Sequence, residues 1–106
     1  MSEALALTAA VDRLADRFRS MPQSRLRGAV PGHASRAAAA LALAARLAAT
    51  ALELEGEPPR AFPAAGDFAV GDQLAVAGHD LAAATGDEAV LAAALAEVAA
   101  LAELVA

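Results

Sequence analysis

Apolar side chains recur every three or four residues in four stretches of this 106-residue chain. The first stretch shows the pattern in five residues, spaced by alternating steps of four and three: Leu7, Val11, Leu14, Phe18 and Met21. This spacing places them on one face of an α-helix, which must pack against other helices to leave water. Residues that favour strands are scarce, because the chain has 35 alanines and 15 leucines but no isoleucine, tyrosine or tryptophan. The sequence therefore predicts an all-α protein.

Proline and glycine separate these stretches into four predicted helices, at about residues 3–20, 34–55, 67–84 and 86–105. Ser2 is a suitable N-cap for the first helix, and Pro22 ends it because proline lacks a backbone donor. The connection that follows can hold a short helical turn around Arg25 to Arg27. A second connection, rich in proline after Gly56, predicts a stiff and extended linker with Phe62 as its anchor.

The residues between the last two helices predict a tight turn. Thr85 and Glu88 have the spacing of a capping box, in which each side chain satisfies an exposed amide of the other residue. A turn this short makes the third and fourth helices an antiparallel hairpin. The length suits one domain with one core. We therefore expect residues 1–106 to form a single domain, an antiparallel four-helix up-and-down bundle.

The second predicted helix carries two apolar stripes. Leu41 and Leu52 lie on one side, and the opposite side carries Leu43, Leu47 and Leu54. This helix therefore either lies in the middle of the fold or turns one stripe toward a second copy of the protein. Burial of apolar surface stabilises a fold by about 25 cal/mol per Å², and each alanine buries little area. The core of a monomer therefore contributes little stability. We expect self-association through this second stripe or through the alanine face of the last helix.

Charge is distributed unevenly along the chain, whose formal net charge is −5. Residues 1–36 hold six arginines and three acidic residues, whereas residues 37–106 hold two arginines and ten acidic residues. The sequence has a single cluster of basic residues, which consists of five arginines: Arg17, Arg19, Arg25, Arg27 and Arg36. Guanidinium groups bind oxyanions in a forked geometry, so these residues are candidates for an anion site. The alternative is pairing within or between subunits with the later acidic residues, beginning with Glu53, Glu55 and Glu57.

Two glycines interrupt the third predicted helix. Gly71 and Gly78 are seven residues apart, as are Asp72 and His79. A glycine inside a helix costs about 1 kcal/mol relative to alanine, which calls for a reason. One reason is close packing against another helix. The other is access, since a glycine beside His79 leaves the imidazole open to a ligand or partner.

The run Gly78 to Leu81 resembles the motif of histidine phosphotransfer domains, which are four-helix bundles of about this length with an exposed histidine in mid-helix. The two alanines that follow stand where that family has lysine and glycine. The resemblance implies a phosphoryl or ligand site at His79, with Asp72 and Asp80 nearby. The alternative is a surface or interface histidine hydrogen-bonded to a neighbouring acidic residue.

Other chemistry finds little support in the sequence. Metal ligands on one helix need spacings of three or four residues, and Asp72 and His79 lie about 10.5 Å apart along a helix axis. Asp12 and Asp16 have the right spacing but stand among arginines, which indicates a salt-bridged surface. No nucleophile elbow or phosphate-binding loop is present. We therefore expect no metal, no cofactor and no enzymatic activity.

The acidic chain has no aromatic residue among its basic ones, so it does not fit a nucleic-acid-binding protein. It lacks cysteine, its first residues are acidic, and Arg46 interrupts its longest apolar stretch. These features predict a cytoplasmic protein without a signal peptide or membrane span. The use of arginine without lysine among many alanines resembles small helical proteins of high-GC bacteria of the actinobacterial type, a likeness of composition that implies no function.

These observations together predict a non-enzymatic module for helical protein–protein interaction or self-association. The expected partner is a second copy, giving a homodimer, or another helical protein. The alternative function is a histidine-phosphotransfer-like or small-ligand-binding bundle that acts through His79.

Overall fold

The computed structural model describes residues 2–106, and these residues form helices without any strand. The helices are α1 (Glu3–Arg19), α2 (Gln23–Leu26), α3 (Arg36–Leu54), α4 (Val70–Ala84) and α5 (Glu88–Leu104). A 3₁₀ turn, η1 (Asp67–Ala69), leads directly into α4. The all-α prediction is confirmed, and α2 occupies the connection in which a short helical turn was expected.

Side chains just before three of the long helices cap them. Ser2 accepts a hydrogen bond from the amide of Leu5, and Ser35 accepts one from the amide of Ala38. The predicted capping box before α5 is wrong, because Asp87 caps this helix. Its Oδ1 atom accepts from the amides of Ala89 and Val90, whereas Thr85 accepts only from the amide of Asp87. The side chain of Asp87 adjoins the first turn of α5 and therefore reaches these amides. Thr85 lies two residues earlier, in extended backbone, and does not reach them.

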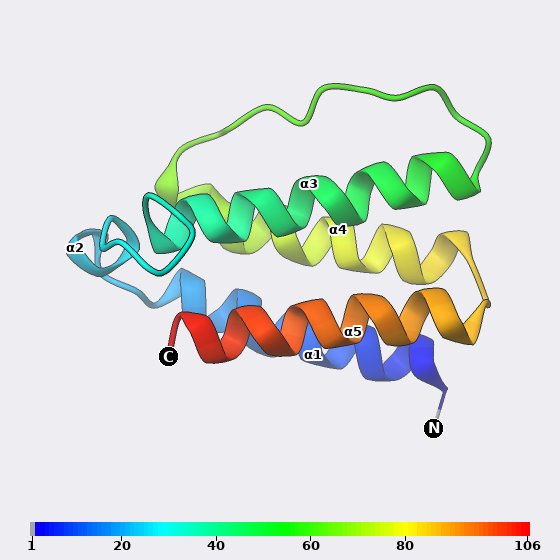
Figure 1. Ribbon diagram of the computed structural model, residues 1–106, viewed down its shortest axis with the longest axis horizontal. Helices are drawn as coiled ribbons and strands as arrows, with labels where there is room; N and C mark the ends of the chain where they lie inside the picture. Colours follow the sequence, from blue (N-terminus) through cyan, green and yellow to red (C-terminus); the bar gives the residue numbers. More distant parts are fainter. Residues whose placement is uncertain (1) are drawn as a thin grey trace.

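Four long helices lie side by side (Figure 1). α4 packs along α3 on one side and along α1 on the other, and α5 packs along α1. α3 and α5 contact each other much less. α3 and α4 run in the same direction, opposite to α1 and α5 (Figure 1).

The predicted up-and-down order is therefore wrong. Residues 55–66 run back along the length of α3 before α4 begins, so α3 and α4 are parallel (Figure 1). Twelve extended residues can span up to about 40 Å. The 19 residues of α3 rise only about 28 Å, so this linker is long enough to return to the starting end. The turn after α4 does reverse the chain, but α5 then packs on α1 and not along α4.

The core lies along the inner faces of these helices. All five residues of the first apolar stripe are buried, as predicted. In α3, Leu43 and Leu47 are buried, but Leu54 of the same predicted stripe is 43% exposed at the end of the helix. Leu41 and Leu52 are half-buried on the side that faces the linker. The second stripe of α3 is thus met by the chain's own linker, in which Phe62 is half-buried. Among residues 2–106, no polar or charged side chain is buried.

Among the helices of residues 2–106, α3 alone has the length and apolar composition of a membrane span, with a mean hydropathy of 1.6. Within the bundle, 39% of that stretch is buried. Helices in the cores of bundles share these properties.

Candidate functional site

Two glycines determine how closely α1 and α4 approach. Both Gly71 and Gly78 are buried against α1. A Cβ atom at Gly78 would lie 2.6 Å from Cγ2 of Val11, and one at Gly71 would lie 2.8 Å from the carbonyl oxygen of Ala15. Neither distance is tolerable for a real carbon atom, so this helix pair requires glycine at both positions.

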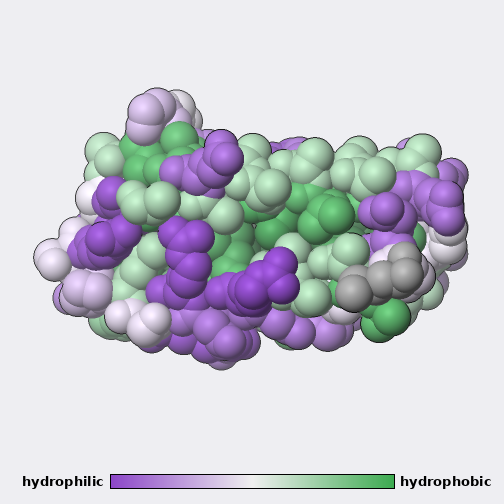
Figure 2. All heavy atoms as spheres, turned by 90° about the horizontal axis from the view of Figure 1, so that it is seen from below, coloured by the Kyte–Doolittle hydropathy of each residue, from purple (hydrophilic) through white to green (hydrophobic). Residues whose placement is uncertain are grey.

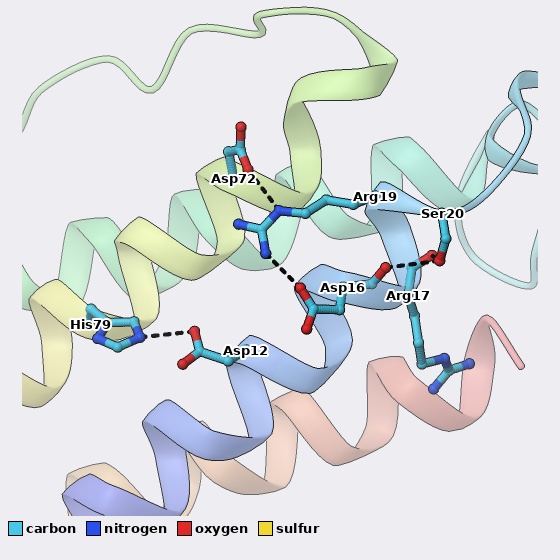
Figure 3. Close-up of polar contacts among 7 residues, drawn as sticks. All are labelled: Asp12, Asp16, Arg17, Arg19, Ser20, Asp72 and His79. Atoms are coloured by element: carbon cyan, nitrogen blue, oxygen red, sulfur yellow. Dashed lines mark hydrogen bonds and ion pairs between the residues drawn. The ribbon is translucent and has the colours of Figure 1, made fainter.

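Beside this close contact, a row of polar side chains joins α1 to α4 (Figure 3). Arg19 lies between two carboxylates, with its Nε 2.8 Å from Oδ1 of Asp72 and its NH1 2.8 Å from Oδ1 of Asp16. The hydrogen bond with Asp72, then the one with Asp16, raises the pKa of Arg19 above its ordinary value. The negative charge of Asp72 is therefore balanced by the positive charge of Arg19.

His79 belongs to the same row but has a different partner. Its Nε2 lies 2.9 Å from Oδ1 of Asp12, and its side chain is 50% exposed. Figure 3 shows the ring turned toward α1, two helical turns from Asp72. Asp80 points elsewhere and lines a cavity with Arg60 and Phe62.

The structure therefore does not bring His79, Asp72 and Asp80 together as one site. Asp12, the residue that does meet His79, was recognised in the sequence only as part of a salt-bridged face. The i, i+4 pattern of α1 places Asp12 on a surface. Nothing in that pattern tells which residue of another helix it faces. The described residues contain no group of three or more His, Cys, Asp or Glu side chains able to hold a metal ion.

Three of the five clustered arginines bind the C-terminal end of α5. Arg17 donates to the carbonyl oxygen of Ala102 at 3.3 Å. Arg25 and Arg36 both donate to the carbonyl oxygen of Val105, at 3.1 and 3.3 Å. The last turn of α5 has no basic residue of its own, so these guanidinium groups satisfy its free carbonyls and oppose its negative dipole end. Figure 3 shows Arg17 reaching toward α5.

The other two arginines of the cluster pair with acidic residues of the second half of the chain. Arg19 binds Asp72, and Nε of Arg27 lies 3.5 Å from Oδ2 of Asp67. Only Arg25 and Arg36 share a partner, the carbonyl oxygen of Val105, so the five guanidinium groups do not converge on one anion. The expected pairing with Glu53, Glu55 and Glu57 is not observed among residues 2–106.

We expect Arg36→Met to lower the free energy of unfolding by about 1 kcal/mol, because it removes a charged donor from a partly buried carbonyl and keeps an apolar stem. Urea unfolding followed by circular dichroism measures this change. Arg13→Met is the matched control, since Arg13 is exposed and makes no hydrogen bond or ion pair within residues 2–106. An equal loss in both variants would contradict a specific role for Arg36.

The outer face of α5 is lined with alanine. Six residues on the side away from the core are exposed: Ala89, Ala92, Ala93, Ala96, Ala99 and Ala100. Figure 2, which views the molecule from the side of α1 and α5, shows pale green apolar surface extending beside the hydrophilic side chains. Glu97 lies at the edge of this face, where its Oε1 is 3.2 Å from Nε of Arg46 on α3.

No family model matches this chain, and neither the curated proteins nor the solved structures yield a match.

Proposed function

We propose that this protein is a non-enzymatic interaction module that forms a homodimer through the alanine face of α5. The observation that carries the proposal is the mismatch between the composition of α5 and its burial. Only three of its 17 residues are charged, Glu88, Glu97 and Glu103, and its remaining residues are alanine, leucine and valine. A helix that is apolar on every side is normally buried on every side. In the single chain, α5 packs on one side against α1 and leaves the opposite side open.

Alanine on this face suits contact with another helix. Ala89, Ala93, Ala96 and Ala100 follow one another at steps of four, three and four residues, which makes a continuous strip. Small side chains let two helix axes approach to about 8 Å. Because a two-fold dimer uses the same surface twice, α5 would pack against α5 of the second copy. The covered surface would then complete the burial of the most apolar part of the chain.

Ala96→Arg is the variant that tests the dimer. Ala96 lies at the centre of the strip, so the substitution would place two unpaired guanidinium groups against each other in a dry contact. We expect the unaltered protein to sediment with the mass of a dimer at micromolar concentration and the variant to sediment as a monomer. Arginine forms helices well, so the fold itself should remain intact by circular dichroism.

Ala83→Arg is the matched control. Ala83 is exposed on α4, and α4 does not pack along α5. This variant should remain dimeric. A monomer mass for the unaltered protein would remove the proposal. If both variants were monomeric, the dimer contact could not be assigned to α5.

A second candidate is a phosphotransfer or small-ligand module acting through His79. It is favoured by one observation, the half-exposed position of this histidine in the middle of α4. The carboxylate of Asp12, 2.9 Å from Nε2 of His79, disfavours a phosphoryl group there, because like charges repel. His79→Ala separates the two candidates. It should leave the dimer mass unchanged, and the unaltered protein should gain no phosphoryl group from acetyl phosphate by intact-protein mass spectrometry.

A further inference from the structure

The linker across α3 and α4 is loosely seated. We call residues 57–66 the strap; it arches over the bundle from the end of α3 to the start of α4 (Figure 1). Every strap residue is exposed except Phe62, which is half-buried. In the middle of the strap, one hydrogen bond to the helices is present, from Nε2 of Gln73 to the carbonyl oxygen of Pro63 at 2.9 Å. Between its two ends, therefore, one half-buried side chain and one hydrogen bond hold this segment in place.

The surface beneath the strap is apolar and incompletely covered. On α3 it consists of Leu41, Ala45, Ala48 and Leu52, which form the second stripe of this helix. On α4 it includes Val76, which is 60% exposed. Open cavities lie beside Phe62, one of about 270 Å³ over α3 and one of about 280 Å³ toward α4. We call this surface the α3/α4 groove.

The strap leaves the α3/α4 groove incompletely filled. An extended chain fills only the middle of the space and leaves cavities beside it. A helix with its side chains is about 10 Å across and fits between the ridges of two packed helices. Binding of an amphipathic helix in an apolar groove is a common mode of recognition between proteins.

Charge identifies the kind of helix that would fit. Glu55 and Asp80 line the cavity over α3, and Glu53 and Glu57 line the cavity of about 420 Å³ at the end of that helix. Arg60 is the one basic residue that lines any of the cavities along the strap, and it belongs to the strap itself. If the strap moves away, the groove loses Arg60 together with Glu57 and keeps the carboxylates of Glu53, Glu55 and Asp80. Its rim is then complementary to arginine or lysine.

We infer that the strap is a displaceable cover and that the α3/α4 groove binds a basic amphipathic helix of a partner protein. An apolar side chain of the partner takes the place of Phe62, and a basic side chain takes the place of Arg60 opposite Glu55 and Asp80. The groove lies on α3 and α4, whereas the dimer proposed above uses α5. The two surfaces can therefore be tested separately.

The test uses a synthetic 15-residue helical peptide of leucine, alanine and arginine with one tryptophan on its apolar face. The protein has no tryptophan, so a blue shift of peptide fluorescence reports entry into the groove. Phe62→Ala should bind this peptide about tenfold more tightly than the unaltered protein, which corresponds to about 1.4 kcal/mol, because the competing strap is weakened. Phe68→Ala is the matched control and should bind as the unaltered protein does, since Phe68 is exposed outside the strap.

Three further measurements complete the experiment. A peptide with glutamate in place of arginine should bind at least about tenfold more weakly, because its charges have the same sign as those of the rim. The double variant Glu55→Gln, Asp80→Asn should lose affinity for the arginine peptide only. Ala96→Arg should leave affinity unchanged, so failure of the α5 dimer does not affect this result. Absence of binding, equal binding of both peptides, or equal affinities for Phe62→Ala and Phe68→Ala would each overturn the inference.

Discussion

Phe18→Ala is expected to lower the free energy of unfolding by about 3–5 kcal/mol, the usual range for a buried aromatic side chain. Phe18 is 2% exposed and packs where α1 and α4 lie close together, since a Cβ atom at Gly71 would lie 3.5 Å from Cβ of Phe18. Many residues of the core are alanines, which cannot extend to fill a void. Because domains of this size are stable by about 5–15 kcal/mol, a large part of the stability would be lost. Urea unfolding measured by circular dichroism determines the change.

The other two phenylalanines provide matched controls for the same substitution. Phe62 is half-buried under the strap, and Phe68 is 64% exposed. The same substitution should cost about 1 kcal/mol at Phe62 and less than about 0.5 kcal/mol at Phe68. A loss at Phe68 equal to that at Phe18 would contradict the described core.

Gly78→Leu is expected to lower the free energy of unfolding by about 3 kcal/mol, since overpacking a closed contact forces the helices apart. The first added carbon would meet all three side-chain carbons of Val11 at 3.0 Å or less. Valine is stiff because it is branched at Cβ, so α1 itself must move. Gly78→Ala should cost less, because it adds one carbon atom where leucine adds four, and in both variants about 1 kcal/mol of improved helix propensity offsets part of the clash. Thermal and urea unfolding both measure these losses.

Gly86→Leu is the control for a glycine that makes no close contact. No atom lies within 4 Å of a Cβ built at Gly86, in the turn before α5, so its stability should stay within about 0.5 kcal/mol. A double-mutant cycle then identifies the cause of the loss at Gly78. Val11→Ala removes the clashing methyl groups, so Gly78→Ala combined with Val11→Ala should lose less than the sum of the single losses. Strict additivity would show that Val11 is not the obstacle.

Helices, their caps and their inward faces could largely be predicted from local sequence. The apolar stripe of α1 is buried as its spacing indicates, Ser2 caps this helix, and Phe62 anchors the linker. Each of these features depends on residues within one or two helical turns of each other. The capping prediction before α5 was wrong because the short turn contains two possible caps, and Asp87, which adjoins the first turn, accepts from the helix amides while Thr85 accepts only from the amide of Asp87.

The candidate site was predicted only in part. The importance of Gly71, Gly78 and the arginine cluster was visible in the sequence, but the partners of these residues were not. His79 meets Asp12 across 67 positions, and Arg25 meets the carbonyl of Val105 across 80. Such contacts depend on which helices are neighbours and on the register between them.

By itself, the sequence determined the helices and the face that each one buries, because helical periodicity and the breaks made by proline and glycine act locally. The tertiary structure alone decided that α3 and α4 run parallel, that α5 packs on α1, and that the strap covers the second stripe of α3. The physical reason is that the hydrophobic effect is non-directional, so an apolar stripe can be buried against any apolar surface and in either direction. Helix neighbours are selected by close packing over the whole bundle, where two glycines let α4 pack closely on α1 and a long linker allows α3 and α4 to run parallel.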